Sequence, residues 1–243
     1  MTQVVFEECF NPDLDWCKIT KQFEQYGRIE IRNIFRPEIA TLLQQCLLKQ
    51  VPWSVACNVD GQQKTIPAHT WQAMSRNDQH ALWQRTVAQS TEAFRFWYES
   101  FMMVTAYLNK SFPELPLHAF LEYLNSSAFQ DKARLFTGFS DIRKVDAQAT
   151  RYLPGHFLLA HDDNGDKQGE IRRAAYVLSL SEGWHPDWGG LLHFYENGQV
   201  VESFIPRFNS LFVFRTPQMH AVSYVAPYAT KPRLSITGWF RAD

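Results

Sequence analysis

The sequence has little of several features that would assign it to a specialised class of protein. Its 24 Lys and Arg residues nearly balance its 25 Asp and Glu residues, so no basic field argues for nucleic acid binding. No stretch approaches the roughly 18 apolar residues of a membrane span. The N-terminus, MTQVVFEECFNPDLDW, carries acidic residues where a signal peptide needs a basic start. We therefore expect a cytoplasmic protein with no membrane partner and no direct nucleic-acid partner.

Cysteine is also scarce, and the sequence contains no linker-like stretch and no convincing internal repeat. All four cysteines lie in the first quarter of the chain and none forms a CxxC pair, so we interpret them as reduced thiols rather than a disulfide framework or a zinc site. No Pro/Gly/Ser-rich stretch divides the sequence. With 45% hydrophobic residues, the 243 positions are enough for one domain, residues 1–243, with a large core.

Residues 1–141 read as mostly helical, with a few strands. IEIRNIF alternates apolar and polar side chains and predicts a strand, and Pro37 then opens PEIATLLQQCLLKQ, whose apolar spacing predicts a helix. WSVACNV reads as extended, followed by a turn at Asp60-Gly61. A long helical zone is predicted over residues 77–108, with further helical turns over 119–125. Within that zone we interpret the aromatic-rich TEAFRFWYESFMMV as helix packed on a sheet, with a ligand groove as the alternative.

Residues 142–243 have a different texture, with short apolar or alternating runs between turns. Eight such runs are ATRYL, HFLLAHDD, AAYVLSLS, GGLLHFYE, QVVESFI, SLFVFR, HAVSYV and RLSITGWF. This spacing favours a β-sandwich or barrel over βαβ units. The sequence therefore predicts an α+β protein in which helices from the first half buttress a β-core.

One short motif suggests a metal site. In LLAHDDN, the alternation of a strand would point His161 and Asp163 the same way and Asp162 the opposite way. His220, in TPQMHAV, is the best candidate for a third ligand from a distant strand. Two histidines and one carboxylate leave positions open on the metal, an arrangement associated with non-haem Fe(II) oxygenases.

Thirteen positions after His220, a second motif suggests an anion site. In RLSITGW, Arg233 and Ser235 share one face of a strand, and Leu234 and Ile236 occupy the other. A guanidinium beside a hydroxyl is suited to bind one carboxylate. Without such an anion, an arginine inside a barrel would be a costly buried charge.

The order of these segments resembles a known family. YLPGHFLLAHDD, RRAAYVLSLSEGW, DWGGLLHFYE, IPRFNSLFVF, HAVSYV and RLSITGWF resemble the prolyl-hydroxylase branch of the Fe(II)/2-oxoglutarate dioxygenases. The resemblance is strongest to the ribosomal prolyl hydroxylases, which modify a decoding-centre protein of the small ribosomal subunit. It is dense over about residues 150–241 and loose over the first half of the chain.

The resemblance implies a fold, cofactors and site residues. The fold is a double-stranded β-helix (jelly roll) over residues 142–243, supported by residues 1–141. Fe(II) is the expected metal, 2-oxoglutarate and O2 are the co-substrates, ascorbate is a reductant, and no catalytic side chain is expected beyond the metal site. The implied metal ligands are His161, Asp163 and His220, and the implied co-substrate contacts are Arg233, which pairs with the C5 carboxylate, and Tyr152, Ser235 and Ser179.

The resemblance favours a target proline in a ribosomal or translation-related protein as substrate, with succinate and CO2 as products. A small-molecule hydroxylase acting on a free amino acid or metabolite is the alternative, and a catalytically idle binding module is a third hypothesis that the intact ligand set disfavours. The eukaryotic ribosomal hydroxylases carry a second, degenerate barrel that these residues do not supply, so substrate presentation by it is not expected. A protein substrate would need an open cleft, walled by KVDAQAT and HDDNGDKQGE.

Other polar residues near these motifs are interpreted as structural. His156 precedes the metal motif and is expected to pack or face solvent, His185 lies in a turn-rich loop, and His193 reads as a strand histidine bonded by its neighbours. Arg172 and Arg173 open a strand beside the motif. We expect a solvated edge there, with substrate contact as the alternative.

Overall fold

A computed structural model describes residues 6–164 and 169–243. The helices are α1 (Trp16–Tyr26), α2 (Pro37–Lys49), α3 (Ala68–Ala73), α4 (Arg76–Gln89), α5 (Met103–Leu108), α6 (Leu117–Leu124), α7 (Ser127–Thr137) and the 3-10 turn η2 (Pro186–Trp188). The strands are β1 (Arg28–Arg32), β2 (Ser54–Val59), β3 (Gln62–Ile66), β4 (Phe96–Phe101), β5 (Lys144–Val145), β6 (Gln148–Tyr152), β7 (Phe157–His161), β8 (Arg172–Ser179), β9 (Leu192–Glu196), β10 (Gln199–Phe204), β11 (Ser210–Arg215), β12 (His220–Val222) and β13 (Arg233–Arg241).

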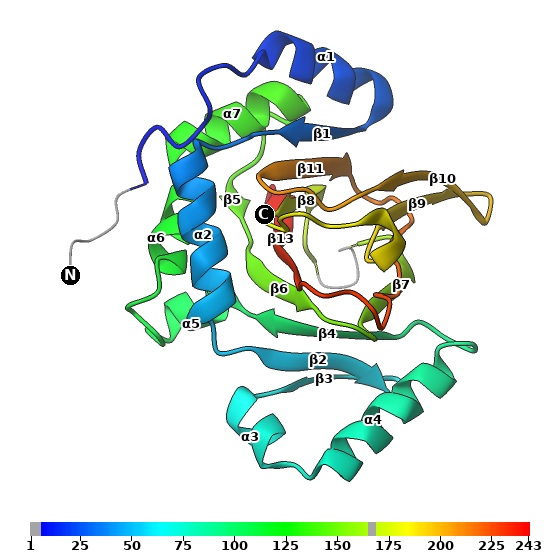
Figure 1. The fold of residues 1–243 in the computed structure, drawn as a ribbon. Helices are drawn as coiled ribbons and strands as arrows, with labels where there is room; N and C mark the ends of the chain where they lie inside the picture. The colour runs from blue at the N-terminus through cyan, green and yellow to red at the C-terminus, as the bar shows by residue number, and fades with distance from the viewer. Residues whose placement is uncertain (1–5, 165–168) are drawn as a thin grey trace.

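The strands form one antiparallel sheet that curls around a central space (Figure 1). Along the sheet the order is β1-β11-β8-β13-β6-β4-β7-β12-β9-β10, with β2 and β3 extending it beside β4. The eight runs predicted in the second half are present as β6 to β13, which confirms the jelly-roll expectation. The first half contributes β1 to β4 to this sheet, so its strands are more numerous than its helical texture indicated.

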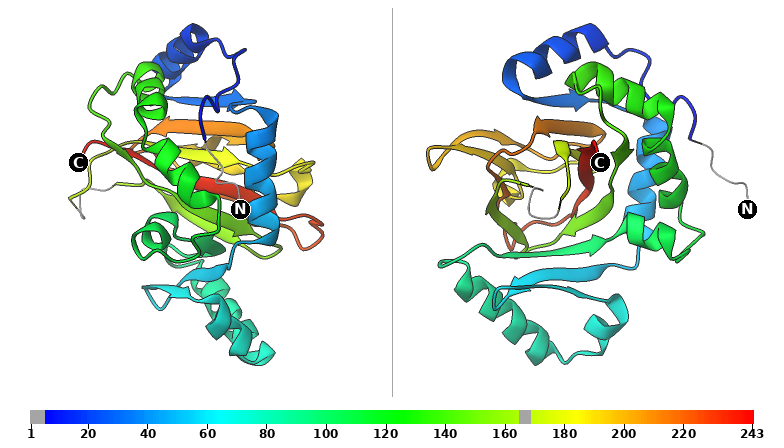
Figure 2. Two further views of the ribbon diagram at one scale, coloured as in Figure 1. Left: turned by 90° about the vertical axis from the view of Figure 1, so that its left-hand side faces the viewer. Right: turned by 180° about the vertical axis from the view of Figure 1, so that it is seen from behind.

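Helices cover one side of the curled sheet and exclude water from it. In Figures 1 and 2, α2, α6 and α7 lie along that side, and α3 and α4 lie at the far end beside β2 and β3. The core between helices and sheet contains Leu43, Phe120 and Phe136 from the helices and Leu234 and Ile236 from β13, all almost fully buried. Burying one such side chain stabilises the fold by about 1.5–3 kcal/mol. Because this face of β13 packs against the helices, the opposite face lines the interior of the barrel.

Local signals explain where the two main buttressing helices begin and end. The predicted helix after Pro37 is α2, with that proline at its first turn, where no backbone N–H is needed. At α7, the Ser126 side chain accepts a hydrogen bond from the Phe129 N–H. The helix ends at Gly138, whose φ of 75° is the left-handed conformation that glycine adopts readily.

The prediction of one helical zone over residues 77–108 is wrong. The structure has α4, then strand β4, then α5. β4 pairs with β2 along one edge and with β6 and β7 along the other. All six residues of its sequence FWYESF are buried or half-buried, so both faces of the strand are covered as well. Tertiary packing rather than local helical spacing decides its conformation.

Across residues 6–164 and 169–243, no helix is both long enough and apolar enough to cross a lipid bilayer.

Candidate metal and co-substrate site

The two candidate histidine ligands lie opposite each other on adjacent strands. β12 pairs antiparallel with β7, and His220 is the cross-strand partner of His161. Directly opposed residues on one face of a sheet have neighbouring side chains, and here the imidazole centroids are 4.2 Å apart. Strand pairing thus brings together two residues that are 59 positions apart in the sequence.

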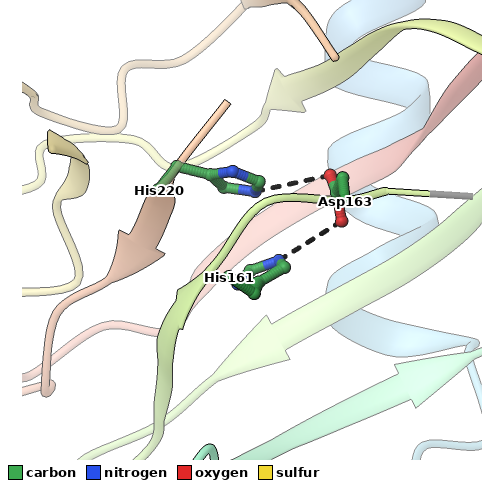
Figure 3. A group of neighbouring side chains, drawn as sticks. All are labelled: His161, Asp163 and His220. Carbon is green, nitrogen blue, oxygen red and sulfur yellow. Dashed lines mark ion pairs between the residues drawn. The ribbon is translucent and has the colours of Figure 1, made fainter. Parts of the chain in front are cut away.

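Asp163 completes the group from a turn rather than from the strand. β7 ends at His161, and Asp163 has a φ of 59°, a left-handed conformation that aspartate adopts more readily than most residues. Its Oδ1 lies 3.3 Å from His161 Nε2, and its Oδ2 lies 3.4 Å from His220 Nε2 (Figure 3). Asp162 is exposed, as expected. The predicted arrangement is therefore produced by a turn, not by strand alternation as the sequence suggested.

Backbone carbonyl groups fix the orientation of both imidazole rings. His161 Nδ1 donates to the carbonyl of Leu159 at 2.9 Å, and His220 Nδ1 donates to the carbonyl of Gln218 at 2.8 Å. Because a carbonyl only accepts, Nδ1 carries the proton in each neutral ring, and Nε2 keeps its lone pair. Both lone pairs face Asp163. Histidine ligands of metals are usually oriented in this way, by a hydrogen bond from the ring nitrogen that does not bind the metal.

Burial and mutual charge prepare this group for a cation. Burial, reinforced by His161, lowers the pKa of His220 to about 4. Burial would also lower the pKa of His161, but the hydrogen bond and charge of Asp163 outweigh it, so that pKa is raised. Burial raises the pKa of Asp163, but the hydrogen bond from His161 and the nearby histidines lower it overall. The carboxylate is thus ionised at neutral pH, and a divalent cation can displace the histidine proton.

These three residues offer ligand atoms that all lie within 4.8 Å of one another, and no other group of three or more such residues is found in the part of the chain that the structure describes. They line a cavity of about 80 Å³. At roughly 10–15 Å³ for each water, that is room for about five to eight water molecules. A short dicarboxylate matches this size, whereas a peptide does not.

Arg233 enters the same cavity from β13. Its side chain is 2% exposed, and its Nη1 donates to Ser235 Oγ at 3.2 Å. Ser235 Oγ in turn lies 2.8 Å from Thr150 Oγ1. The guanidinium stacks over the ring of Tyr152, with 4.9 Å from Cζ to the ring centroid. Burial lowers the pKa of Arg233, although Tyr152 opposes this shift.

The guanidinium is incompletely satisfied by the protein. Arg233 Nε is buried and has no hydrogen-bond partner among the described residues. A buried cation without a counter-charge is costly, so the donor set fits a carboxylate better than it fits a structural role. Gly190 makes room for this side chain, because a Cβ there would lie 3.2 Å from Arg233 Cδ and the backbone φ is 62°.

The other predicted contacts are placed at different depths. Tyr152 is buried and lines the cavity, stacked on Tyr98 with centroids 5.1 Å apart. Ser235 lies behind Arg233 rather than among the lining residues, and Ser179 is its cross-strand partner. Ser179 Oγ is buried, without a hydrogen-bond partner in the described part of the chain. The structure thus brings Tyr152 and Arg233 to the cavity and leaves the two serines one layer back.

Among the lining residues that sequence reasoning missed are Tyr98, Gln148 and Trp239. Tyr98 was missed because β4 was read as helix. Its pKa is raised to about 12, mainly by burial. Trp239 could have been found from alternation, since it shares the inward face of β13 with Arg233.

An outer groove of about 590 Å³ adjoins the cavity. Tyr98, Gln148 and Trp239 line both spaces. The far wall of the groove includes Gln63 and Thr65 of β3. Of the two predicted cleft loops, KVDAQAT contributes through Asp146 to Gln148, whereas part of HDDNGDKQGE lies outside the described residues.

The remaining histidines do not join the metal group. His156 is buried just before β7, His185 caps η2, and His193 Nδ1 is 2.7 Å from Ser203 Oγ. Arg173 pairs with Asp141. Arg172 is not the solvated edge that was expected, because its side chain is only 12% exposed.

Comparison with known proteins gives this site a family. Residues 147–241, the segment that contains all of the candidate ligands, match the 2OG-Fe(II) oxygenase superfamily. The metal that this oxygenase superfamily uses is Fe(II), and its co-substrates are 2-oxoglutarate and O2. The histidine–aspartate–histidine donor set fits Fe(II), and the incompletely satisfied guanidinium of Arg233 fits a carboxylate of 2-oxoglutarate.

Two relatives are both named Prolyl 3-hydroxylase OGFOD1. The Mus musculus protein is 38% identical over 104 residues, and the Xenopus laevis protein is 34% identical over 131 residues. These matches cover 40% and 49% of this chain but only 18% and 25% of the relatives. The chain therefore spans a quarter or less of the relatives it matches.

A solved structure shows the same oxygenase fold. It is a prolyl hydroxylase from Trichoplax adhaerens in complex with a hypoxia inducible factor oxygen degradation domain peptide fragment. The TM-score is 0.61 at 20% sequence identity, and the match covers 93% of this chain and 89% of that chain. At this identity the likeness concerns the fold.

Proposed function

We propose that this protein is an Fe(II)- and 2-oxoglutarate-dependent dioxygenase that hydroxylates a proline in a ribosomal or translation-related protein. One observation carries the proposal. A histidine–aspartate–histidine donor group and a buried, incompletely satisfied arginine line one cavity of dicarboxylate size. The names of the two relatives support a prolyl substrate and favour hydroxylation at carbon 3.

In this proposal His161, Asp163 and His220 would hold Fe(II) at the wall of the cavity that they line. When bound, Fe(II) with 2-oxoglutarate and O2 supplies the oxidising chemistry that inserts oxygen into an unactivated C–H bond and releases succinate and CO2. Arg233 would hold the distal carboxylate of the co-substrate through its unsatisfied donors. No side chain is assigned a general acid or base role.

The aromatic walls would exclude water and orient the substrate. Tyr98 and Tyr152 form a stacked pair beside Arg233, and Trp239 stands where the cavity opens to the outer groove. A closed, largely apolar surround strengthens the pairing of Arg233 with a carboxylate, because water no longer competes for its donors.

The outer groove supports a polypeptide substrate. The inner cavity has room for a small acid, and the adjoining groove of about 590 Å³ has room for several further groups. A free amino acid would not need it. We therefore place the target residue near Trp239 and the flanking polypeptide along the groove beside β3.

Succinate release provides the test. Purified protein is incubated with Fe(II), 2-oxoglutarate and O2, with and without a proline-bearing loop peptide from the decoding-centre ribosomal protein. Succinate is quantified, and the mass of the peptide is then measured by mass spectrometry. We expect peptide-stimulated succinate release and one added oxygen atom on proline. Iron-dependent turnover that no peptide stimulates, but that a free amino acid does stimulate, would show that the substrate is a small molecule rather than a protein. Absence of iron-dependent turnover under all conditions would reject the dioxygenase proposal.

A further inference from the structure

One aspartate in the candidate metal group has an unusual backbone conformation that the rest of the site must maintain. Asp163 lies just beyond the end of β7, and its φ of 59° is uncommon for a residue with a side chain. The Gln218 N–H donates to the Asp162 carbonyl at 3.1 Å, and the Asn164 N–H donates to Asp162 Oδ1 at 3.1 Å. Both carboxylate oxygens must nevertheless reach the two histidines at once. The bonds of Asp162 hold the residues on either side of Asp163, and the carbonyl of Asp163 itself has a different partner.

Arg172, at the start of β8, contacts this turn directly. Its Nη1 donates to the backbone carbonyl of Asp163 at 3.3 Å, at the long end of the normal range. Its guanidinium also stacks flat on Trp239, with 3.8 Å from Cζ to the ring centroid. The backbone of Asp163 and the ring of Trp239 are thus joined through a single planar group.

The position of Arg172 is itself fixed. Its Nε and Nη2 bond Glu170 Oε2 at 2.8 and 2.5 Å, and Glu170 also accepts from Arg241 Nη1 at 2.9 Å. Arg241 is anchored in turn by Asp146 and Asp243. Because Glu170 neutralises Arg172, the guanidinium adds little net positive charge near a metal, and its contribution is one of geometry.

Trp239 connects this network to the cavity. It lines both the cavity and the outer groove. Its indole Nε1 is buried without a hydrogen-bond partner among the described residues, and Asp163 lines the same cavity. Arg172 therefore packs against an indole ring that forms part of the wall of the candidate metal cavity.

We propose that Arg172 is a positioning residue for the metal ligand Asp163: it holds the left-handed turn through the Asp163 carbonyl, and it supports Trp239, which lines the same cavity. This inference rests on the proposed metal site and assigns Arg172 neither a solvated edge nor a substrate contact. Planarity is essential to it: lysine keeps the charge but lacks the flat fork that stacks and donates in two directions.

The matched control lies next to Arg172 on the same strand. Arg173 points to the opposite side, pairs with Asp141 at 2.5 Å and is 38% exposed. Arg172→Lys and Arg173→Lys thus make the same chemical change at neighbouring positions, and only the first touches the metal ligand.

The experiment titrates metal-free protein with Co(II), whose visible absorption reports ligand number and geometry. Loss of the wild-type absorption in Asp163→Ala first establishes that the signal comes from this site; no signal in the wild type would reject the metal site itself and hence the proposed function. With the site established, we expect Arg172→Lys to weaken Co(II) binding about 10-fold or more and to alter the absorption, as loss of a group supporting a ligand does. Arg173→Lys should bind within about twofold of the wild type.

A thermal melt of the metal-free variants separates positioning from general stabilisation. We expect Arg172→Lys to lose metal affinity even where its metal-free melting temperature equals that of Arg173→Lys. If folded Arg172→Lys binds Co(II) with wild-type affinity and absorption, or if Arg173→Lys loses as much affinity, the positioning role is refuted while the proposed metal site stands.

Discussion

Replacing Arg233 with methionine should separate two properties that normally fall together, stability and ligand binding. The guanidinium is 2% exposed, and its Nε has no hydrogen-bond partner among the described residues. Methionine fills a similar volume without a charge to desolvate. Because exchanging buried charges for apolar groups is often neutral or stabilising, we expect Arg233→Met to melt at the wild-type temperature or above it when no 2-oxoglutarate is present.

The affinity of Arg233→Met for 2-oxoglutarate should fall, although its stability does not. Breaking a buried charge pair with the distal carboxylate costs about 2–5 kcal/mol, which is at least about a 30-fold loss of 2-oxoglutarate affinity. At 100 times its dissociation constant, 2-oxoglutarate stabilises the wild type by about 2.7 kcal/mol. At about 2–4 °C for each kcal/mol in a chain of this size, the melting temperature rises by about 5–11 °C. The same concentration should raise that of Arg233→Met by no more than about 3 °C.

The assay is a thermal melt with Mn(II) in place of Fe(II), which prevents turnover, with and without 2-oxoglutarate. Arg207→Met is the control, because Arg207 is 38% exposed and pairs with Glu30 far from the cavity; its shift should equal that of the wild type. An Arg233→Met protein that keeps the full 2-oxoglutarate shift would refute the carboxylate role. One that unfolds markedly earlier without ligand would show that Arg233 stabilises the fold instead.

Three further predictions concern other parts of the molecule. Asp163→Ala should abolish metal binding and turnover while Asp162→Ala costs far less, because only Asp163 faces the histidines and the Asp162 side chain bonds the Asn164 N–H in the turn; equal losses in a metal titration would contradict the ligand assignment. Thr65→Arg, on the wall of the outer groove, should reduce turnover of a polypeptide at least 10-fold, while Gln62→Arg on the same strand does not; equal kcat/KM values would argue against the groove. Burial lowers the pKa of His156 from 6.5 to about 4, so the unfolded chain binds a proton between these values and stability falls as pH drops through this range. His156→Phe should therefore lose about 2 kcal/mol less than the wild type between pH 7 and pH 5 in urea unfolding, and an unchanged loss would exclude this histidine as the cause.

Sequence patterns predicted the β-core well because its strands are short apolar or alternating runs, each bounded by turn residues. The inward face of β13 followed from period two alone, with Arg233 toward the cavity and Leu234 and Ile236 toward the helices. β4 could not be predicted in this way. Its two faces are both covered by other elements, so its apolar run lacks the alternation that marks a half-buried strand.

The sequence by itself determined which residue types are available to hold a metal and a carboxylate, because H-x-D, a distant histidine and R-x-S are local patterns. Tertiary structure alone decided how they meet. The pairing of β12 with β7 sets His220 opposite His161, and a left-handed turn rather than strand alternation aims Asp163 at both. Strand partners and turns of this kind depend on contacts between segments far apart in the chain, so they are fixed only when the sheet closes and the packing around Trp239 and Arg172 is complete.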